Sequence, residues 1–158
     1  MMNSENLEGA LQELARAIDN HEQWHKELTR TIVCRLPHDY RDVADNAHRH
    51  CRFGKWYYGS VAPDLRAHEA FAAMEVEHER MHRFAAELLR ASAAGLRIAP
   101  DDYDRFANVI GIDAEIIFEA RGNLHRHAAR ENDFRLIRDK TWRGDDDLIA
   151  LFEQCSES

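Results

Sequence analysis

The sequence predicts an all-α fold, an antiparallel four-helix bundle in which one short helix carries Cys51. Three observations support this prediction. Apolar residues recur at alternating steps of four and three through long segments, which is the spacing of one face of an α-helix. Proline and glycine lie between these segments, where helices begin and end. No run of β-branched residues alternates with polar residues at a period of two, so we expect no strands.

The first segment predicts one long helix of about thirty residues. This helix ends near Pro37, because proline disfavours helical geometry in the preceding residue and has no N–H to donate. A shorter second helix is predicted from about Val43 to Tyr58, with Cys51 on one face, before Gly59 and Pro63 interrupt the pattern. The inward-facing positions of the first segment are Leu7, Leu11, Leu14, Ile18, His21, His25, Leu28 and Ile32.

The third predicted helix runs from Pro63 to Ala94, and Gly95 is placed to end it. The fourth begins at Pro100, which acidic residues follow in the first turn, and runs into the 130s. We assign residues 1–140 to one helical bundle domain and residues 141–158 to an acidic C-terminal tail that can form a short helix.

Composition and charge exclude several classes of protein. Acidic residues outnumber basic ones by 29 to 21, and the net charge of −8 leaves no basic surface for nucleic-acid binding. No stretch approaches the roughly 18 consecutive apolar residues of a membrane span, and no signal peptide begins the chain. The three cysteines, Cys34, Cys51 and Cys155, are an odd number at wide spacing, unlike the dense even sets of small secreted domains. We therefore expect a cytoplasmic protein.

Histidines on the predicted inward faces indicate a metal site. His78 and His82 stand four residues apart, so their imidazoles project from one helix face a single turn apart and can hold one ion. These two residues and His21 occupy positions where leucine would be expected, and burying them without partners would cost on the order of a few kcal/mol. This argument supports the His78/His82 pair and makes His21 a third candidate. Cys51 stays open, because a single cysteine is more often a small buried apolar residue than a ligand.

The depth of these histidines in the bundle can be compared. At about 1.5 Å per residue, His21 lies about 16 Å before Ile32 on the first helix, and His78 lies about 16 Å before Leu89 on the third. One ion can reach both helices only if the two levels coincide. That depends on the relative directions of the helices, which this spacing leaves open.

Three motifs together resemble the chemoreceptor zinc-binding (CZB) family. That family has a histidine on its first helix, a Cys-x-x-Gly-x-Trp motif on a short second helix and a His-x-x-x-His motif on the third. The resemblance covers roughly residues 7–130 and implies a regulatory domain that forms a homodimeric helical bundle with one zinc in each protomer. The matching segments are His21 with Gln23-Trp24 after it, Cys51-Arg52-Phe53-Gly54-Lys55-Trp56, and Glu77-His78-Glu79-Arg80-Met81-His82.

Carried over by motif, the resemblance implies that Zn²⁺ is bound by His21, Cys51, His78 and His82. Three imidazole nitrogens and one thiolate suit tetrahedral zinc, and four protein ligands leave no open position for water. We therefore predict a sensor and not an enzyme. Its input is either zinc occupancy or the oxidation of Cys51 by an oxidant such as hypochlorous acid.

Members of this family are usually fused to a chemoreceptor signalling region or to a diguanylate cyclase. The sequence contains no Gly-Gly-Asp/Glu-Glu-Phe signature and no coiled-coil signalling region. We therefore expect the domain to act in trans on a separate partner, either a diguanylate cyclase in cyclic di-GMP signalling or a chemoreceptor in chemotaxis.

Other polar residues near the motifs have candidate supporting roles. His25 lies at the next inward-facing step of the first helix, as a competing ligand or as a group that orients a ligand. Glu75 and Asp113 lie on the inward stripes of their helices and are candidate acceptors for the N–H groups of ligand histidines.

The neighbours of Cys51 have simpler interpretations. Among the remaining histidines, His48 and His50 are expected nearest the metal. Gly54 is interpreted as permitting a tight bend or a close approach of helices beside Cys51.

Two alternatives from other classes remain. The first is a hemerythrin-like or ferritin-like bundle with a di-iron centre, for which Glu75 and His78 supply one Glu-x-x-His pair. Against it, the fourth helix offers no counterpart, and di-iron sites do not require a thiolate. The second is an interaction bundle whose histidines only pack.

Overall fold

The computed structural model describes residues 4–128, and the fold of these residues is entirely helical, without a strand. The predicted domain boundary at residue 140, the C-terminal tail and the predicted continuation of the fourth helix lie outside this range. In chain order the helices are α1 (Ser4–Val33), the 3-10 helix η1 (Tyr40–Val43), α2 (Ala47–His50), α3 (Arg52–Gly59), α4 (Pro63–Arg66), α5 (Glu69–Ala93) and α6 (Pro100–Ala128).

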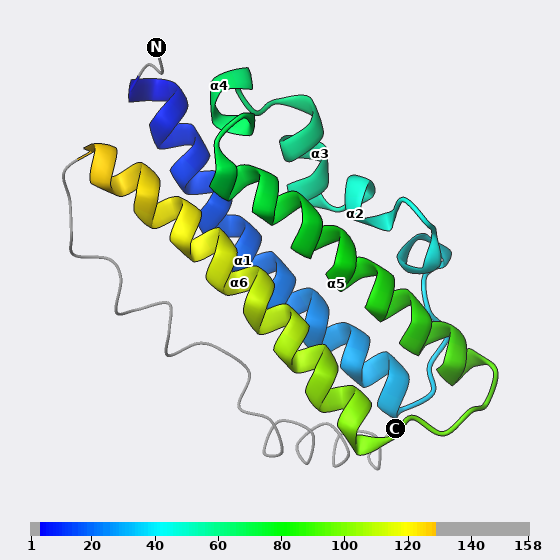
Figure 1. Cartoon of the computed structure of the whole chain (residues 1–158). Coiled ribbons are helices and arrows are strands. Elements are labelled where there is room, and N and C mark those ends of the chain that lie inside the picture. The colour runs from blue at the N-terminus through cyan, green and yellow to red at the C-terminus, as the bar shows by residue number, and fades with distance from the viewer. Residues whose placement is uncertain (1–3, 129–158) are drawn as a thin grey trace.

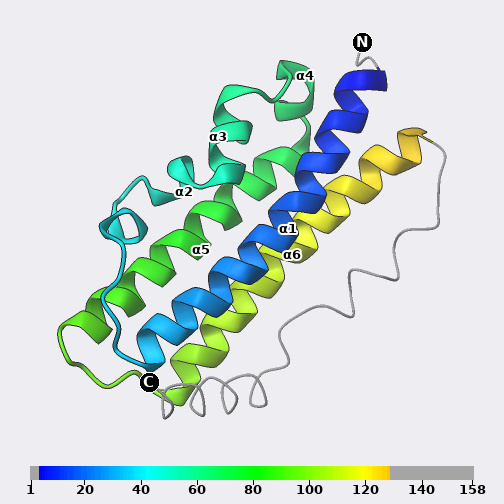
Figure 2. The same cartoon turned by 180° about the vertical axis from the view of Figure 1, so that it is seen from behind.

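The three long helices lie side by side along the length of the molecule (Figure 1). Helices α1 and α5 run in the same direction, and α6 runs antiparallel to both. The segment from η1 to α4 extends from the end of α1 back to the start of α5, as the reverse view in Figure 2 also shows. Several short helices therefore form this segment, where the sequence predicts one continuous helix.

The prediction of a single helix from Val43 to Tyr58 is wrong. The chain forms η1, α2 and α3 in succession, and the break between α2 and α3 falls at Cys51, whose φ of −65° and ψ of 163° are extended. In this conformation the Cys51 sulfur caps α3 by accepting a hydrogen bond from the Gly54 N–H. Cys51 thus lies at a junction between two helices and not on a helix face.

The third predicted helix is also divided. α4 ends at Arg66, and the extended backbone of His68 begins α5, where its Nδ1 accepts a hydrogen bond from the Ala70 N–H. The predicted end at Gly95 is confirmed. Its φ of 74° is left-handed, and its N–H donates to the Ser92 carbonyl in a closing turn of the Schellman kind.

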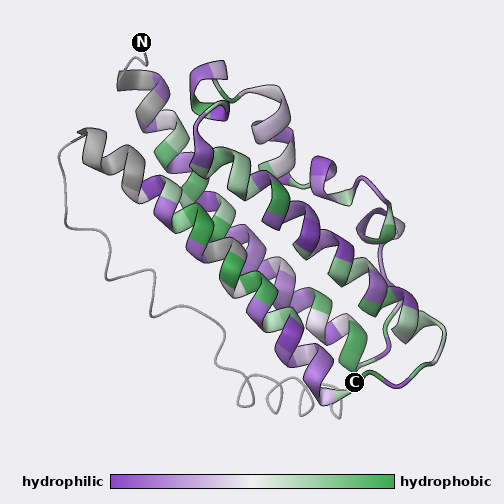
Figure 3. Ribbon diagram, in the orientation of Figure 1, coloured by the Kyte–Doolittle hydropathy of each residue, from purple (hydrophilic) through white to green (hydrophobic). Residues whose placement is uncertain are grey.

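Two apolar clusters fill the interior, and a layer of histidines lies between them. Hydrophobic and hydrophilic residues alternate along the long helices (Figure 3), and none of the helices within residues 4–128 is both long and apolar enough to cross a membrane. The first cluster, near the starts of α1 and α5, includes Leu14, Ile18, Tyr57, Phe71, Met74 and Ile117. The second, near their ends, includes Leu28, Ile32, Met81, Leu89 and Phe106.

Leu14 tests the first apolar cluster, because its exposed fraction is 0%. Replacing it with alanine leaves a cavity between α1 and its neighbours, so we expect Leu14→Ala to lower the free energy of unfolding by about 2–5 kcal/mol. The matched control is Val76→Ala on α5, where 64% of the residue is exposed and the change should stay within about 0.5 kcal/mol. Urea denaturation measures both variants. A loss for Leu14→Ala no larger than that of the control would contradict this core.

Candidate metal centre

The four residues predicted to bind zinc come together where α1, α5 and the α2–α3 junction meet. His21 lies on α1, His78 and His82 lie on α5, and Cys51 lies at the junction. Each offers one donor atom, and these four atoms lie within 4.8 Å of one another. The three histidines are buried and Cys51 is partly exposed. We refer to these four residues as the His3Cys group.

The parallel direction of α1 and α5 sets the depth of the His3Cys group. The ends of the two helices are tied together by the Ser92 hydroxyl, which donates to the Ile32 carbonyl at 3.3 Å. His21 and His78 lie at the same level of the bundle. Their rings stack with centroids 5.0 Å apart and an interplanar angle of 21°. The relative direction that the sequence left open is thus the one that lets a single ion reach both helices.

The Cys51 sulfur has partners from both sides of the junction. It lies 3.2 Å from Nε2 of His78, accepts a hydrogen bond from the Gly54 N–H at 3.2 Å, and donates to the His48 carbonyl at 3.5 Å. The Gly54 N–H belongs to the first turn of α3, so the start of this helix provides one of the two backbone partners of the sulfur.

His82 is the clearest sign that a partner belongs at this position. Both of its ring nitrogens are buried and have no hydrogen-bond partner within residues 4–128. A buried polar atom left in that state costs about 1–3 kcal/mol, and a metal bound to one nitrogen would remove part of that cost. The arrangement of donor atoms therefore fits a soft divalent ion such as zinc.

Burial keeps these imidazoles neutral, which is the form that binds metals. The low-polarity surroundings hold the pKa of His78 far below its usual 6.5 and lower the pKa of His82 to about 3. For both residues the neighbouring His21 adds to the effect, because two like charges would be held close together.

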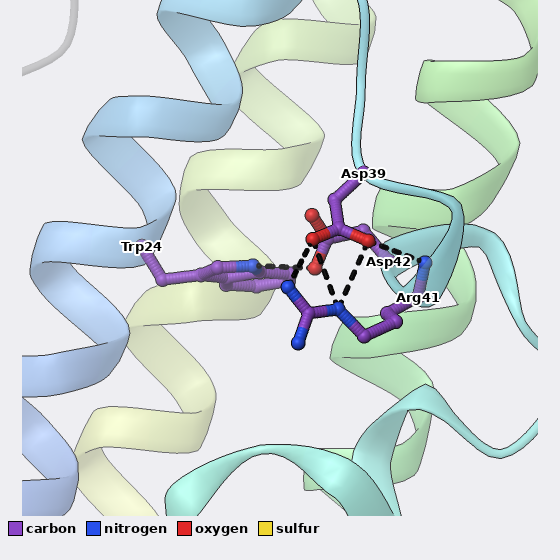
Figure 4. Close-up of polar contacts among 4 residues, drawn as sticks. All are labelled: Trp24, Asp39, Arg41 and Asp42. Atoms are coloured by element: carbon purple, nitrogen blue, oxygen red, sulfur yellow. Dashed lines mark hydrogen bonds and ion pairs between the residues drawn. The ribbon is translucent and has the colours of Figure 1, made fainter.

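An aromatic side chain covers one side of the His3Cys group. The Trp24 ring lies 4.6 Å from the His82 ring between centroids, and its Nε1–H donates to the Asp42 carboxylate at 3.2 Å. Figure 4 shows Trp24 reaching from α1 to η1, where Asp39 binds both the backbone N–H and the guanidinium of Arg41. The contacts of Arg41 lower the pKa of Asp39 to about 2, whereas burial raises the pKa of Asp42 against the opposing effect of the Trp24 bond.

From the sequence alone, Trp24 is assigned no role of its own and Asp42 is not singled out. The signal for Trp24 was available, because it lies within the first of the three matching motifs. Nothing in the local sequence pairs it with a carboxylate eighteen positions later.

The other histidines near the group separate into different roles. His25 is buried on α1 outside the His3Cys group and packs edge-on against Phe106 of α6, with ring centroids 4.8 Å apart. His48 is buried beside the group, its ring 6.4 Å from that of His78, and burial lowers its pKa. His50 is exposed.

The two candidate acceptor carboxylates remain predictions. Glu75 accepts a hydrogen bond from the Tyr58 hydroxyl at 3.0 Å, and burial together with this bond raises the pKa of Tyr58 to about 12. Asp113 lies on α6 between Ile110 and Ile117, level with the boundary between the two apolar clusters. Its side chain is outside the part of the chain that the structure describes.

The fold and the His3Cys group together define a helical domain with four donor atoms that could hold one metal ion. Residues 21–89 match the family model described as the chemoreceptor zinc-binding domain. These residues therefore belong to a chemoreceptor zinc-binding (CZB) domain. The matched segment begins at His21 and includes the whole His3Cys group. Comparisons with curated proteins and with solved structures returned no match.

The depressed pKa values of His78 and His82 predict how the stability of the metal-free protein depends on pH. Below pH 6.5 the unfolded chain takes up protons at these residues while the folded protein does not, so the unfolded state is favoured as the pH falls. Each histidine contributes a slope of about 1.4 kcal/mol per pH unit, which is absent above pH 6.5 and for His82 ends near pH 3.

Urea denaturation at pH 7.5, 6.5 and 5.5 in the presence of a chelator measures this slope. We expect His82→Leu to reduce it by the share of one histidine, and His50→Gln, at an exposed histidine, is the matched control. A wild-type free energy of unfolding that stays constant from pH 7.5 to 5.5 would show that these imidazoles are not held neutral.

Proposed function

We propose that this domain binds one Zn²⁺ through His21, Cys51, His78 and His82 and acts as a sensor that regulates a separate signalling protein. The observation that carries the proposal is the convergence of four donor atoms within 4.8 Å from three separate parts of the chain. The match to the CZB family supports zinc as the ion.

The donors suit a closed tetrahedral zinc site. Zinc lies about 2.0–2.1 Å from imidazole nitrogen and 2.3 Å from thiolate sulfur, which places nitrogen and sulfur donors roughly 3.6 Å apart in a tetrahedron. The observed distance between the Cys51 sulfur and Nε2 of His78 is 3.2 Å. With four protein ligands the ion has no open position for an attacking water, so the proposed role is regulatory and not hydrolytic.

Zinc occupancy is the first candidate signal. Donor atoms spread over as much as 4.8 Å must draw closer to about 3.3–3.6 Å around one zinc ion, so we propose that binding moves the four side chains relative to one another. Loss of the ion reverses this shift. Trp24 touches both His82 and Asp42, and is placed to transmit the change to η1.

Oxidation of Cys51 is the second candidate signal. Cys51 is partly exposed, whereas the three histidines of the His3Cys group are buried, so an oxidant in solution reaches the sulfur first. Hypochlorous acid converts a thiolate to a sulfenic acid and releases chloride, which removes the anionic ligand from the ion. We therefore propose Cys51 as the reactive ligand.

The helix directions and the family match support a proposal for the assembly and the output. The directions of α1, the η1–α4 segment, α5 and α6 alternate, which supports an antiparallel four-helix bundle whose second member is broken (Figure 1). The CZB family supports a cytoplasmic homodimer that acts on a diguanylate cyclase or a chemoreceptor in trans. The His3Cys group contains no carboxylate, which does not favour the di-iron alternative.

Metal analysis tests zinc binding directly. We expect gently purified wild-type protein to hold one zinc per chain and Cys51→Ala to bind zinc about 100-fold more weakly or worse, since a ligand contributes more than the 10–100-fold typical of groups that only orient ligands. His50→Ala, an exposed histidine next to Cys51 in the sequence, is the matched control and should retain wild-type affinity. Wild-type protein that neither contains zinc nor takes it up would end the proposal.

Zinc release on oxidation tests the second candidate signal. We expect one equivalent of hypochlorous acid to release zinc from the wild type, followed by rebinding after reduction, because sulfenic acid is reversible. A variant that keeps Cys51 as its single cysteine, with Cys34 and Cys155 replaced by serine, should respond in the same way. Release at the same oxidant dose from a Cys51→His variant that still binds zinc would assign the reaction to another residue. A colorimetric zinc indicator follows all three proteins.

A further inference from the structure

Gly54 occupies a place in the fold where no side chain fits. A Cβ atom at this position would lie 1.9 Å from the His48 carbonyl oxygen and 2.9 Å from Cα of Arg49. Both obstacles are backbone atoms of α2, so a rotamer change cannot move them away. The last turn of α2 therefore rests directly on the first turn of α3, and the absence of a side chain at Gly54 permits this contact.

The need for glycine here is one of space. The backbone of Gly54 is not in the left-handed region, and helix propensity disfavours glycine relative to alanine by about 1 kcal/mol. Gly59, in the same helix, has nothing within 4 Å of an added Cβ. The two glycines of α3 therefore differ in their surroundings: another backbone segment lies against Gly54, and none lies against Gly59.

The two groups that meet at Gly54 are the two that hold the Cys51 sulfur within its own segment. The Gly54 N–H donates to the sulfur at 3.2 Å, and the His48 carbonyl accepts from it at 3.5 Å. Cys51 itself is the C-cap of α2 and the N-cap of α3. The distance between α2 and α3 therefore fixes where the sulfur stands relative to Nε2 of His78.

We propose that Gly54 is the positioning residue for the Cys51 sulfur, and that any side chain at this place withdraws the sulfur from the metal while the three long helices persist. This inference rests on the proposed zinc site. Relieving a contact of 1.9 Å requires α2 and α3 to separate by about 1 Å or more, because heavy atoms at rest seldom approach closer than 3 Å. Metal–ligand distances tolerate only about 0.2 Å. The displacement exceeds the tolerance several-fold, so the metal keeps three histidines and loses the thiolate.

Cobalt binding tests this inference, because Co²⁺ occupies tetrahedral zinc sites and a thiolate bound to it gives a near-ultraviolet charge-transfer band. The full chain is titrated with Co²⁺ and then with Zn²⁺ as wild type, Gly54→Ala, Cys51→Ala, the double variant, and the matched control Gly59→Ala. We expect the wild type and Gly59→Ala to show the band. Gly54→Ala should lose it, keep its helical circular dichroism, and bind Zn²⁺ about 100-fold more weakly.

The double variant separates positioning from general damage. If Gly54 acts through the sulfur, Gly54→Ala should cost no further affinity once Cys51 is alanine. A double variant whose loss of zinc affinity is the product of the two single losses would overturn the inference. A wild-type charge-transfer band in Gly54→Ala, or a loss of its helical circular dichroism, would also overturn it. A wild type that binds neither ion would instead refute the proposed zinc site, so the two failures are distinguishable.

Discussion

The burial of neutral imidazoles between α1 and α5 is the constraint on which the rest of this structure depends. His21, His78 and His82 lie between two apolar clusters, where leucine would pack without cost. Imidazole nitrogens in such a place must stay uncharged and still need partners. Desolvation secures the first condition by lowering the pKa values of His78 and His82. The second leaves His82 with two unsatisfied nitrogens within the described chain, a demand that an ion can meet.

The fourth donor, the Cys51 sulfur, lies outside the layer of histidines. Its position explains why the predicted second helix is divided at Cys51. On a continuous helix a cysteine would present its sulfur from one face, with the backbone amides ahead of it already committed to the helix. At a break, Cys51 ends α2 and begins α3, so its sulfur receives an N–H from α3 while standing 3.2 Å from His78. The break costs helical hydrogen bonds between α2 and α3 and provides the sulfur with a backbone N–H donor. In the inference drawn above, the tight contact of α2 with α3 at Gly54 positions the Cys51 sulfur.

How far the sequence predicts this arrangement depends on the range of the interaction. The long helices follow from local periodicity, and the end at Gly95 follows from the left-handed conformation that glycine tolerates. The His78/His82 pair follows from a four-residue step on one helix, and Cys51 came only with the family motif. The breaks at Cys51 and His68 were missed because the capping groups are a thiol and an imidazole, which are not the usual Ser, Thr, Asp or Asn. The Trp24–Asp42 bond was beyond reach, since no local rule joins α1 to η1.

The difference in burial among the four donors bears on whether zinc acts as a signal or only stabilises the fold. Structural zinc in small fingers supplies about 10–16 kcal/mol of binding energy, as much as the whole stability of an ordinary domain, and such folds collapse without metal. Here the two apolar clusters join α1, α5 and α6, and the first also includes Phe53 and Tyr57 of α3 and packs against Cys51. The three histidines lie on the long helices, whereas the partly exposed Cys51 lies at the junction of two short ones. If Cys51 binds zinc as proposed, the contacts of the long helices with one another would remain when the sulfur leaves the ion, and a reversible sensor requires such a fold.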